Sequence, residues 1–238
     1  MKLAFISDIH GNAIALESVL KDINERKVDK VFVLGDICFR GPEPKRSLDL
    51  VRALECNVIK GNADEWIVRG IKKGEVPDNS LTIMNKERDW SCSQLDQNSI
   101  EYLSNLPSEL RFNVGSFKIH AFHATPTSLF EVVPPNVHDE VYENKIMKEN
   151  ADIFIYAHIH KPFIKYIHGR CIINIGSVGL PFDGLNMSSY TILDINDESF
   201  QTSIVRVHYD VNKVIDHLEE LNYPNIDFMR NLLRQAKI

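Results

Sequence analysis

Two short stretches of the sequence place a pair of ionisable side chains directly after an apolar run. Asp8 and His10 follow the run at residues 2–7, and His158 and His160 follow another such run. Each pair has one residue between its members, and carboxylates and imidazoles are both ligands of divalent metal ions. The two stretches suggest metal-dependent chemistry, although each alone is a weak signal because the chain contains nine histidines.

Further polar side chains follow other apolar runs of the chain. In an open α/β sheet the ligand site lies outside the carboxyl ends of the strands, so residues just after parallel strands are expected to meet. Burying several charges at one edge is unfavourable unless something neutralises them, and a pair of divalent cations would do so. The strand-end groups are three carboxylates, one amide and four imidazoles, namely Asp8, Asp36, Asp64, Asn62, His10, His123, His158 and His160.

The donor types narrow the metal and the reaction. Mixed nitrogen and oxygen donors favour first-row ions such as Mn, Fe or Zn over Ca, and no thiolate is present among these donors to select a closed structural zinc site. Two ions held about 3.5–4 Å apart clamp a phosphoryl group and generate a hydroxide near neutral pH. The chemistry predicted from these residues is metal-assisted hydrolysis of a phosphate ester or anhydride.

The elements that must position these residues follow a strand, loop and helix alternation. Residues 2–7 form a nearly continuous apolar run, which is typical of a strand covered on both faces. The spacing of Leu16, Val19, Leu20 and Ile23 predicts a helix next. Strands at about 31–34 and 57–59 flank a helix at about 44–54, a pattern that indicates parallel βαβ units and the α/β class.

The rest of the chain completes a single domain spanning residues 1–238. From about 65 to 106 the pattern is helical without a strand, which we interpret as a helical insertion or cap that lies over or beside the metal rim and helps to select substrate. Strands follow at about 110–114, 117–122 and 152–156, with a helix at about 137–148. Strands at 163–167, 171–175, 190–195 and 200–207 are expected to form an antiparallel set, and helices at about 211–221 and 226–236 end the chain.

Five motifs, in order, resemble those of the calcineurin-like metallophosphoesterases. They are D-x-H at Asp8 and His10, G-D at Gly35 and Asp36, G-N-x-D at Gly61 to Asp64, the lone His123 at a strand end, and x-H-x-H at His158 and His160. Together with "INIGSVGLPFDG" and the stretch from Trp90 to Pro107, they are similar to the longer bacterial branch described as diadenosine-tetraphosphatase-like. The resemblance implies a four-layer α/β/β/α sandwich of two mixed sheets with a helical insertion. It covers all but about the last 30 residues.

The resemblance also implies roles for these residues. Asp8, His10 and His160 would hold one metal ion, Asn62, His123 and His158 a second, and Asp36 would bridge them. The ions implied are two divalent transition metals among Mn, Fe, Zn, Ni and Co, with Mn and Fe preferred. The residues predicted to act in catalysis are Asp36, Asp64 and His123, and those predicted to contact substrate are Asn12, Arg40, Asn62 and Ser177.

Three positions depart from the family pattern. Many relatives have His at Ala63, where it is thought to protonate the leaving oxygen, and a general acid is typically worth about 10²–10⁴-fold. Weakly basic leaving groups such as phosphates and aryl oxides are therefore expected to be favoured over alkyl alcohols. Phe182 stands where close relatives tend to have Arg, so Arg40 is a candidate replacement for a phosphate-holding cation. Ala157 replaces the usual Gly, which matters only if that residue needs a positive φ.

Several residues have two interpretations from sequence alone. Asp64 is either a carboxylate that orients a ligand histidine or a helix N-cap, and Asn12 either touches a phosphate or caps the first helix. Ser177 is more typical of a turn than of a substrate contact. Three aromatic residues could stack on a base but are more typical of a core, namely Phe39, Trp66 and Trp90.

Composition limits the partners. The net charge of −6, from 27 basic and 33 acidic residues, disfavours a long nucleic acid as ligand, and Lys45-Arg46 and Lys72-Lys73 are interpreted as solvated helix faces. The N-terminus lacks a signal-peptide core, and no stretch approaches the roughly 18 apolar residues of a membrane span. The four cysteines have no CxxC pair, which suits a reducing cytosol, so a cytoplasmic protein is expected. A homo-oligomer is compatible with the sequence, which does not determine the oligomeric state.

The function predicted from these observations is hydrolysis of a phosphoanhydride or activated phosphodiester in a small nucleotide, such as a diadenosine polyphosphate. Two alternatives share the fold: a serine/threonine-type protein phosphatase, and a non-catalytic metal-binding scaffold. The scaffold is expected to have degraded motifs, whereas all seven metal-ligand positions here carry competent donors.

Overall fold

Two five-stranded mixed sheets form the centre of the molecule. In the computed structural model, which describes residues 1–237, the first sheet comprises β1 (Lys2–Ile6), β2 (Lys30–Val33), β3 (Asn57–Val58), β9 (Ser188–Ile195) and β10 (Phe200–Val207). Its strand order is β10-β9-β1-β2-β3. The pairs β1–β2 and β2–β3 are parallel, as the βαβ pattern predicts, and β9 runs antiparallel to both β1 and β10.

The second sheet comprises β4 (Glu109–Val114), β5 (Phe117–Phe122), β6 (Ile153–Tyr156), β7 (Phe163–Ile167) and β8 (Arg170–Asn174), in the order β4-β5-β6-β8-β7. Here β5–β6 and β6–β8 are parallel, and β4–β5 and β7–β8 are antiparallel. The predicted single antiparallel set of the four last strands is wrong. Two antiparallel hairpins exist, but they belong to different sheets, because strand alternation reports which face is buried and not which neighbour a strand pairs with.

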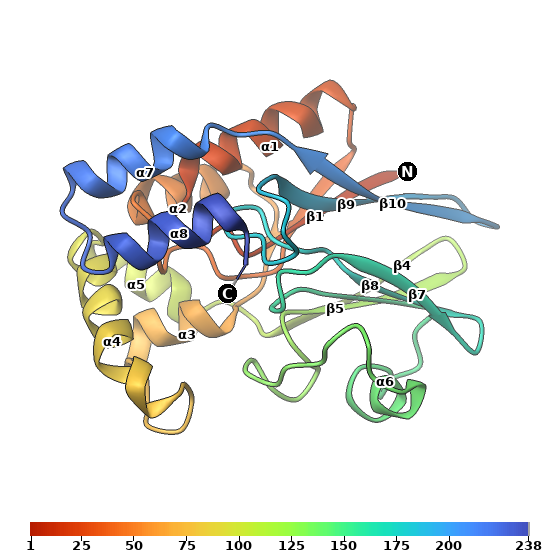
Figure 1. The fold of residues 1–238 in the computed structure, drawn as a ribbon. Coiled ribbons are helices and arrows are strands. Elements are labelled where there is room, and N and C mark those ends of the chain that lie inside the picture. The colour runs from red at the N-terminus through yellow and green to blue at the C-terminus, as the bar shows by residue number, and fades with distance from the viewer. Residues whose placement is uncertain (238) are drawn as a thin grey trace.

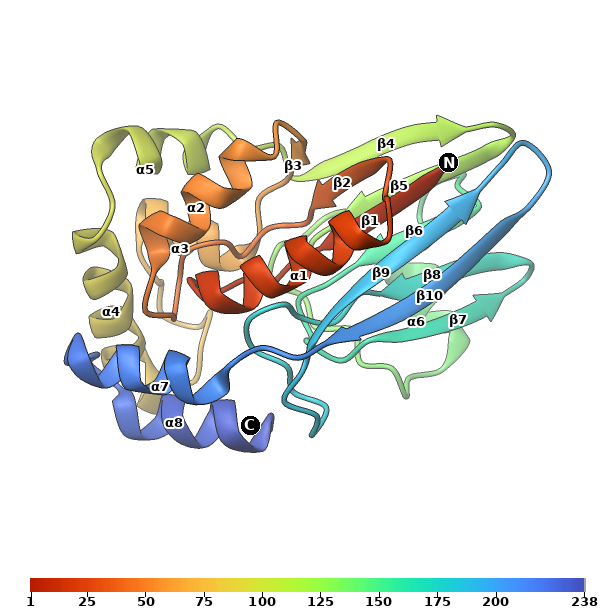
Figure 2. The ribbon, with the colours of Figure 1, turned by 90° about the horizontal axis from the view of Figure 1, so that it is seen from above.

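Helices cover the outer face of each sheet (Figures 1 and 2). The helices α1 (Ala13–Glu25), α2 (Pro44–Ala53), α7 (Val211–Glu220) and α8 (Ile226–Gln235) share one apolar cluster with the outward side chains of the first sheet, and α6 (Asp139–Lys145) packs on the second sheet. The four-layer α/β/β/α sandwich that the resemblance implies is therefore confirmed. No helix within residues 1–237 has both the length and the apolar character that crossing a membrane requires.

The core explains the continuous apolar run at the N-terminus. In β1, Leu3 and Phe5 point into the cluster between the two sheets, where they meet Ile153 and Ile155 of β6. The intervening Ala4 and Ile6 belong to the cluster under the helices. Both faces of this strand are buried, so alternation of side chains produces no polar positions.

Residues 65–106 are helical, as predicted, and contain no strand in the described structure. They belong to α3 (Asn62–Arg69), α4 (Asp78–Ser93) and α5 (Gln97–Ser104). Figures 1 and 2 show these helices at the end of the sandwich toward which β1 runs from the N-terminus. Their buried side chains, including Trp66, Met84 and Leu103, belong to the same cluster as the outer face of the first sheet.

Candidate metal centre

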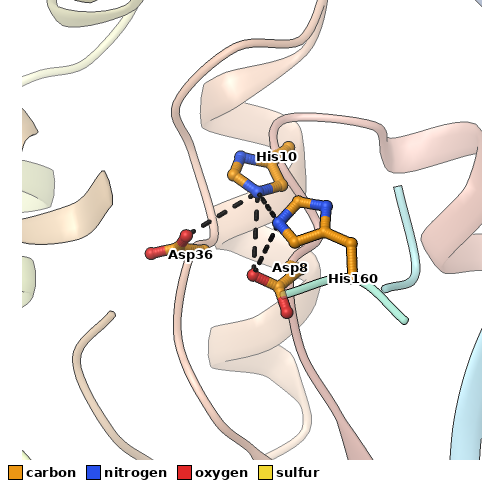
Figure 3. A group of neighbouring side chains, drawn as sticks. All are labelled: Asp8, His10, Asp36 and His160. Carbon is orange, nitrogen blue, oxygen red and sulfur yellow. Dashed lines mark hydrogen bonds and ion pairs between the residues drawn. The ribbon is translucent and has the colours of Figure 1, made fainter. Parts of the chain in front are cut away.

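The polar residues that follow five different strands meet at one end of the sandwich. β1, β2 and β3 of the first sheet and β5 and β6 of the second sheet all end at this place. The predicted convergence at one sheet edge is thus a convergence of two sheets, packed face to face. Figure 3 shows four of the side chains directed toward one another.

Four side chains form a first buried group. Asp8, His10, Asp36 and His160 each offer one ligand atom, and these atoms lie within 4.8 Å of one another. The Nε2 atom of His160 is 3.2 Å from Asp8 Oδ1, and His10 Nε2 is 3.7 Å from an oxygen of each aspartate (Figure 3). Two carboxylates and two imidazoles around one point form a mixed donor set that suits a first-row divalent ion.

A second group lies on the other side of Asp36. The Oδ1 atom of Asn62 is 2.9 Å from His123 Nε2 and 2.8 Å from His158 Nδ1. Asp36 Oδ2 is 3.4 Å from His123 Nε2 and 3.7 Å from His10 Nε2, so one carboxylate oxygen faces both groups. The two groups have the membership that the family resemblance implies, with Asp36 between them.

Backbone carbonyls orient three of the imidazoles. The Nδ1 atom of His10 lies 2.8 Å from Phe39 O, that of His123 lies 2.7 Å from Leu34 O, and that of His160 contacts Leu180 O. A carbonyl oxygen can only accept, so each Nδ1 donates, and in the neutral ring Nε2 carries a lone pair. This arrangement, in which one ring nitrogen is held by the protein and the other faces the centre, is that of histidine metal ligands.

Unpartnered atoms in the first group show that a cation would fit there. The Nε2 atoms of His10 and His160 are 3.3 Å apart, and both rings already donate through Nδ1. The neighbouring Asp8 Oδ1 is buried without a hydrogen-bond partner among the described residues. Two lone pairs and an unpartnered carboxylate oxygen face one point, and a divalent cation there would satisfy all three.

The second group can be satisfied in two ways. With its oxygen toward the rings, Asn62 presents a lone pair to His123 and His158, which a cation would bridge. With the amide reversed, its nitrogen donates to both rings. The amide orientation therefore depends on whether an ion is bound.

The pKa values of the buried aspartates and histidines show that the two donor groups favour a bound positive charge. Burial would lower the pKa of His123, but the carboxylate of Asp36 outweighs it and raises the pKa to about 10. Burial would raise the pKa of Asp8, yet the imidazole of His160 and its neighbours bring it well below its ordinary value. Burial and the charge of His123 lower the pKa of His158 to about 4. The two aspartates thus remain ionised and require a cation or a protonated imidazole beside them.

The backbone at the ligands is strained in a repeated way. Asp8 and His10 both have φ of 52°, and His158 and His160 have φ of 65° and 55°. Left-handed conformations cost a non-glycine residue on the order of 1–3 kcal/mol and cluster at functional sites. After both β1 and β6, every second residue is left-handed. The pairs Asp8/His10 and His158/His160 have the same spacing because the same sharp turn follows each strand. Ala157 does not have a positive φ, so its methyl group replaces the family glycine without strain.

Two motif glycines allow the loops to touch. Gly35 has φ of +89°, and a Cβ built on it would lie 2.2 Å from the backbone nitrogen of Gly61. A Cβ on Gly61 would lie 2.1 Å from Asp36 Oδ1. Neither position can accept a side chain, because the Asp36 carboxylate and the start of α3 occupy that space.

Asp64 positions the loop that carries Asp36. Its carboxylate accepts hydrogen bonds from the backbone N–H groups of Asp36 (2.7 Å), Ile37 (2.9 Å) and Gly61 (3.0 Å). It lies at the third position of α3, and Gly61 is the N-cap. Burial and the charge of Asp36 raise the pKa of Asp64 to about 7. The interpretation of Asp64 as a helix-capping residue agrees with its bond to Gly61 N at the start of α3. Its carboxylate also holds the backbone of the loop that carries Asp36. A role of Asp64 in the reaction itself stays a prediction.

Asn12 and Ser177 are both occupied by contacts within the protein. Asn12 caps α1 by accepting from Ala15 N at 3.0 Å, and its amide donates to Gly179 O at 3.1 Å. Ser177 Oγ donates to Asp8 O and accepts from Leu180 N, both at 2.8 Å. These are the contacts of a helix cap and of a turn residue. Their predicted contacts with substrate remain predictions.

Arg40 forms an ion pair with a buried acid of α4. Its Nη2 lies 3.0 Å from Glu87 Oε2, and the Glu87 side chain is fully buried. Glu87 Oε1 also accepts from Asn225 Nδ2 at 3.2 Å, so this carboxylate links α4, the loop after β2 and the turn before α8. The structure therefore gives Arg40 a partner within the protein, and its predicted contact with a substrate phosphate remains a prediction.

The aromatic residues considered for base stacking pack in the interior. Phe39 and Trp66 are buried and meet edge to face at 5.8 Å, and Trp90 meets Tyr223 at 4.9 Å. Their packing fits the core interpretation.

Replacing Glu87 by Ala is expected to lower the free energy of unfolding by about 2–4 kcal/mol, because it leaves the largely buried Arg40 charge without its partner. Urea unfolding followed by circular dichroism measures this. Asp89→Ala is the matched control on the same helix, since Asp89 pairs with Arg88 at 3.0 Å but its side chain is 70% exposed; a change within about 0.5 kcal/mol is expected there. Equal losses in the two variants would contradict the prediction.

Sequence reasoning missed three kinds of residue at this site. The carbonyls of Leu34, Phe39 and Leu180 have no sequence signal, because any residue carries one. Glu87 lies 47 positions from Arg40 and carries no motif. Lys161, which directly follows His160, could have been noticed from that position alone.

Comparison with known proteins identifies the family. Residues 1–198 match the calcineurin-like phosphoesterase superfamily domain. An uncharacterised protein of Methanocaldococcus jannaschii is 32% identical over 243 residues, covering 93% of each chain. The crystal structure of a metallophosphoesterase from Sphaerobacter thermophilus superposes with a TM-score of 0.80 at 25% identity, covering 99% of each chain. A symmetrical bis(5'-nucleosyl)-tetraphosphatase of Colwellia psychrerythraea is 30% identical over 105 residues, which is 40% of this chain and 37% of that protein.

The match over most of the chain and the buried cluster of aspartates and histidines agree with each other. The chain belongs to the calcineurin-like phosphoesterase superfamily and is a metal-dependent phosphoesterase.

Proposed function

We propose that the protein is a binuclear phosphohydrolase that cleaves a phosphoanhydride or an activated phosphodiester in a small nucleotide, such as a dinucleoside polyphosphate. The observation that carries this proposal is the position of Asp36, whose Oδ2 faces His10 Nε2 of one donor group and His123 Nε2 of the other. A carboxylate shared by two donor groups is the arrangement that a pair of ions requires.

Each side chain has a defined part in this proposal. Asp8, His10 and His160 would hold one ion, Asn62, His123 and His158 the other, and Asp36 would contact both. Two such ions, of which Mn and Fe fit this donor set well, supply a nucleophile near neutral pH and stabilise charge on the phosphoryl group.

The backbone keeps the donors ready for this role. The Ala63 N–H at the start of α3 donates to Asp36 Oδ1 at 2.7 Å, which leaves Oδ2 directed at the two histidines. A helix N-terminus also stabilises the negative charge of that carboxylate. The carbonyls behind His10, His123 and His160 keep a proton on Nδ1 and leave Nε2 available as a donor to metal.

The preference for nucleotide anhydrides has two supports. Ala63 offers no group that can protonate a leaving oxygen, so leaving groups that are already weakly basic should react best. The Colwellia psychrerythraea relative, by its name, acts on bis(5'-nucleosyl) tetraphosphates.

A substrate panel tests the proposal. With Mn²⁺ present, kcat/KM for diadenosine tetraphosphate and for bis(p-nitrophenyl) phosphate is expected to exceed that for an alkyl phosphomonoester by about 10²-fold or more, the lower range of what a general acid contributes. A phosphoserine peptide, the substrate class of a protein phosphatase, has an alkyl leaving group and should react as slowly. Comparable rates on all four substrates would rule out the preference, and no turnover of any would favour the non-catalytic scaffold.

A further inference from the structure

A cavity of about 750 Å³ opens beside the metal centre. It reaches the centre through His158, and its size falls within the roughly 300–1,000 Å³ of small-ligand sites. Four separate segments of the chain surround it. The lining residues are Val132, Pro134, Pro135, His158, Ile159, Lys161, Phe182, Asp183 and Lys237, so in the described part of the chain the helical insertion at 65–106 contributes none.

Two lysines give this cavity a positive charge. No carboxylate of residues 1–237 lies within 4.0 Å of the ammonium group of Lys161 or Lys237. The nearby Asp183 is already paired with Arg206, so its charge is compensated. The chain as a whole carries a net charge of −6. Beside the candidate metal centre, a pair of cations that have no acidic partner within residues 1–237 therefore favours an anionic ligand.

The remaining wall is apolar and includes a flat surface. The ring of Phe182 stacks on the His160 imidazole, with centroids 4.1 Å apart and an angle of 6° between the planes. Val132, an apolar side chain that lines the cavity, is 61% exposed. An exposed aliphatic side chain, two prolines and an aromatic ring suit a planar heterocycle that has apolar faces.

Lys237 belongs to the C-terminal part of the chain, after residue 198, where the match to the family domain ends. The end of α8 docks on the loop after Phe182, where Gly184 N donates to Ala236 O at 2.8 Å. A Cβ on Gly184 would lie 2.9 Å from Lys237 Cε, so the lysine stem crosses this glycine. Figures 1 and 2 show the end of α8 beside the loop that leads into β9.

We propose that this cavity binds the nucleotide portion of the substrate beyond the scissile phosphate, with Lys161 and Lys237 on its remaining phosphates and the apolar wall on its base. The proposal rests on the proposed function and names a specificity site for it. In this proposal α8, which lies outside the matched domain, positions Lys237, one of the two lysines that bind phosphate.

The test compares two substrates in lysine variants. Lys161→Gln and Lys237→Gln are expected to lower the ratio of kcat/KM for diadenosine tetraphosphate to kcat/KM for bis(p-nitrophenyl) phosphate by about tenfold each, mainly through KM, because only the nucleotide has further phosphates to lose. Lys213→Gln, an exposed lysine of α7, is the matched control and should leave the ratio unchanged. Thermal unfolding of each variant establishes that it is folded.

Inhibition of bis(p-nitrophenyl) phosphate hydrolysis separates the phosphates from the base. Both ADP and inorganic tripolyphosphate are expected to inhibit the wild type, and Val132→Ser should weaken ADP about threefold or more, an effect on the scale of losing part of an apolar contact, without changing tripolyphosphate. Ratios in both lysine variants that equal the Lys213→Gln ratio would overturn the cavity proposal and leave the proposed function intact. Equal effects of Val132→Ser on the two inhibitors would overturn the assignment of the base. A wild type that hydrolyses neither substrate would instead overturn the proposed function.

Discussion

Asp36→Asn is expected to lower kcat/KM by on the order of 10³-fold or more while leaving the protein folded. Bound metal supplies several kcal/mol of transition-state stabilisation, and each 1.36 kcal/mol is about a tenfold change in rate. Asparagine has the shape of aspartate, and its amide oxygen can still accept from Ala63 N, as Asp36 Oδ1 does at 2.7 Å. What is lost is the negative charge of the oxygen that faces both donor groups.

The measurement is kcat/KM with bis(p-nitrophenyl) phosphate at saturating Mn²⁺, together with the metal content of the purified variant. Asp216→Asn is the matched control, because Asp216 is an exposed aspartate of α7 and belongs to neither donor group. It should behave as the wild type. A variant of Asp36 that keeps a tenth of the wild-type rate would show that this carboxylate does not hold the metals.

Removal of metal is expected to abolish turnover, and its return is expected to raise the melting temperature. An ion present at about 100 times its Kd adds about 2.7 kcal/mol to the free energy of unfolding. For a chain of this size, about 2–4 °C accompanies each kcal/mol, so each bound ion should raise the melting temperature by about 5–11 °C. The reason is local: the bound ion satisfies the facing Nε2 atoms of His10 and His160 and the buried Asp8 Oδ1.

Thermal unfolding after chelation, and again after adding Mn²⁺, measures this shift. Ca²⁺ serves as the comparison, because it prefers all-oxygen sites and should give little stabilisation where four imidazoles are donors. Metal analysis should find two ions per chain in the wild type and one in His158→Ala, which leaves the first donor group intact. One ion per chain in the wild type would contradict the binuclear proposal while leaving a metal-dependent phosphoesterase.

Both expectations depend on a centre that is held by backbone as much as by side chains. The left-handed residues after β1 and β6, the contact between Gly35 and Gly61, and the carbonyls behind three imidazoles all restrict the donors to one arrangement. Such restriction lowers the rearrangement needed when metal and substrate bind.

The sequence by itself determined which residues meet and most of the elements that carry them. A strand buried on both faces leaves a continuous apolar run, and a helix leaves its own spacing, so β1, α1 and the last two helices could be predicted closely. The candidate metal donors could be grouped because they lie in the loops or at the helix start just after strands, and the ends of parallel strands lie at one end of a sheet. These are local patterns, and local patterns are present in the sequence.

Only the tertiary structure decided the relations between distant segments. The hairpin β9–β10 joins the first sheet because Leu193 of β9 enters the core beside Leu3, a pairing that alternation cannot specify. The same holds for Arg40, whose charge is taken by Glu87 of the insertion, and for Lys237, which reaches the cavity from the end of the chain. Pairing partners, carbonyl positions and cavities arise from packing across the whole chain, and the identity of a residue does not reveal which distant group will lie beside it.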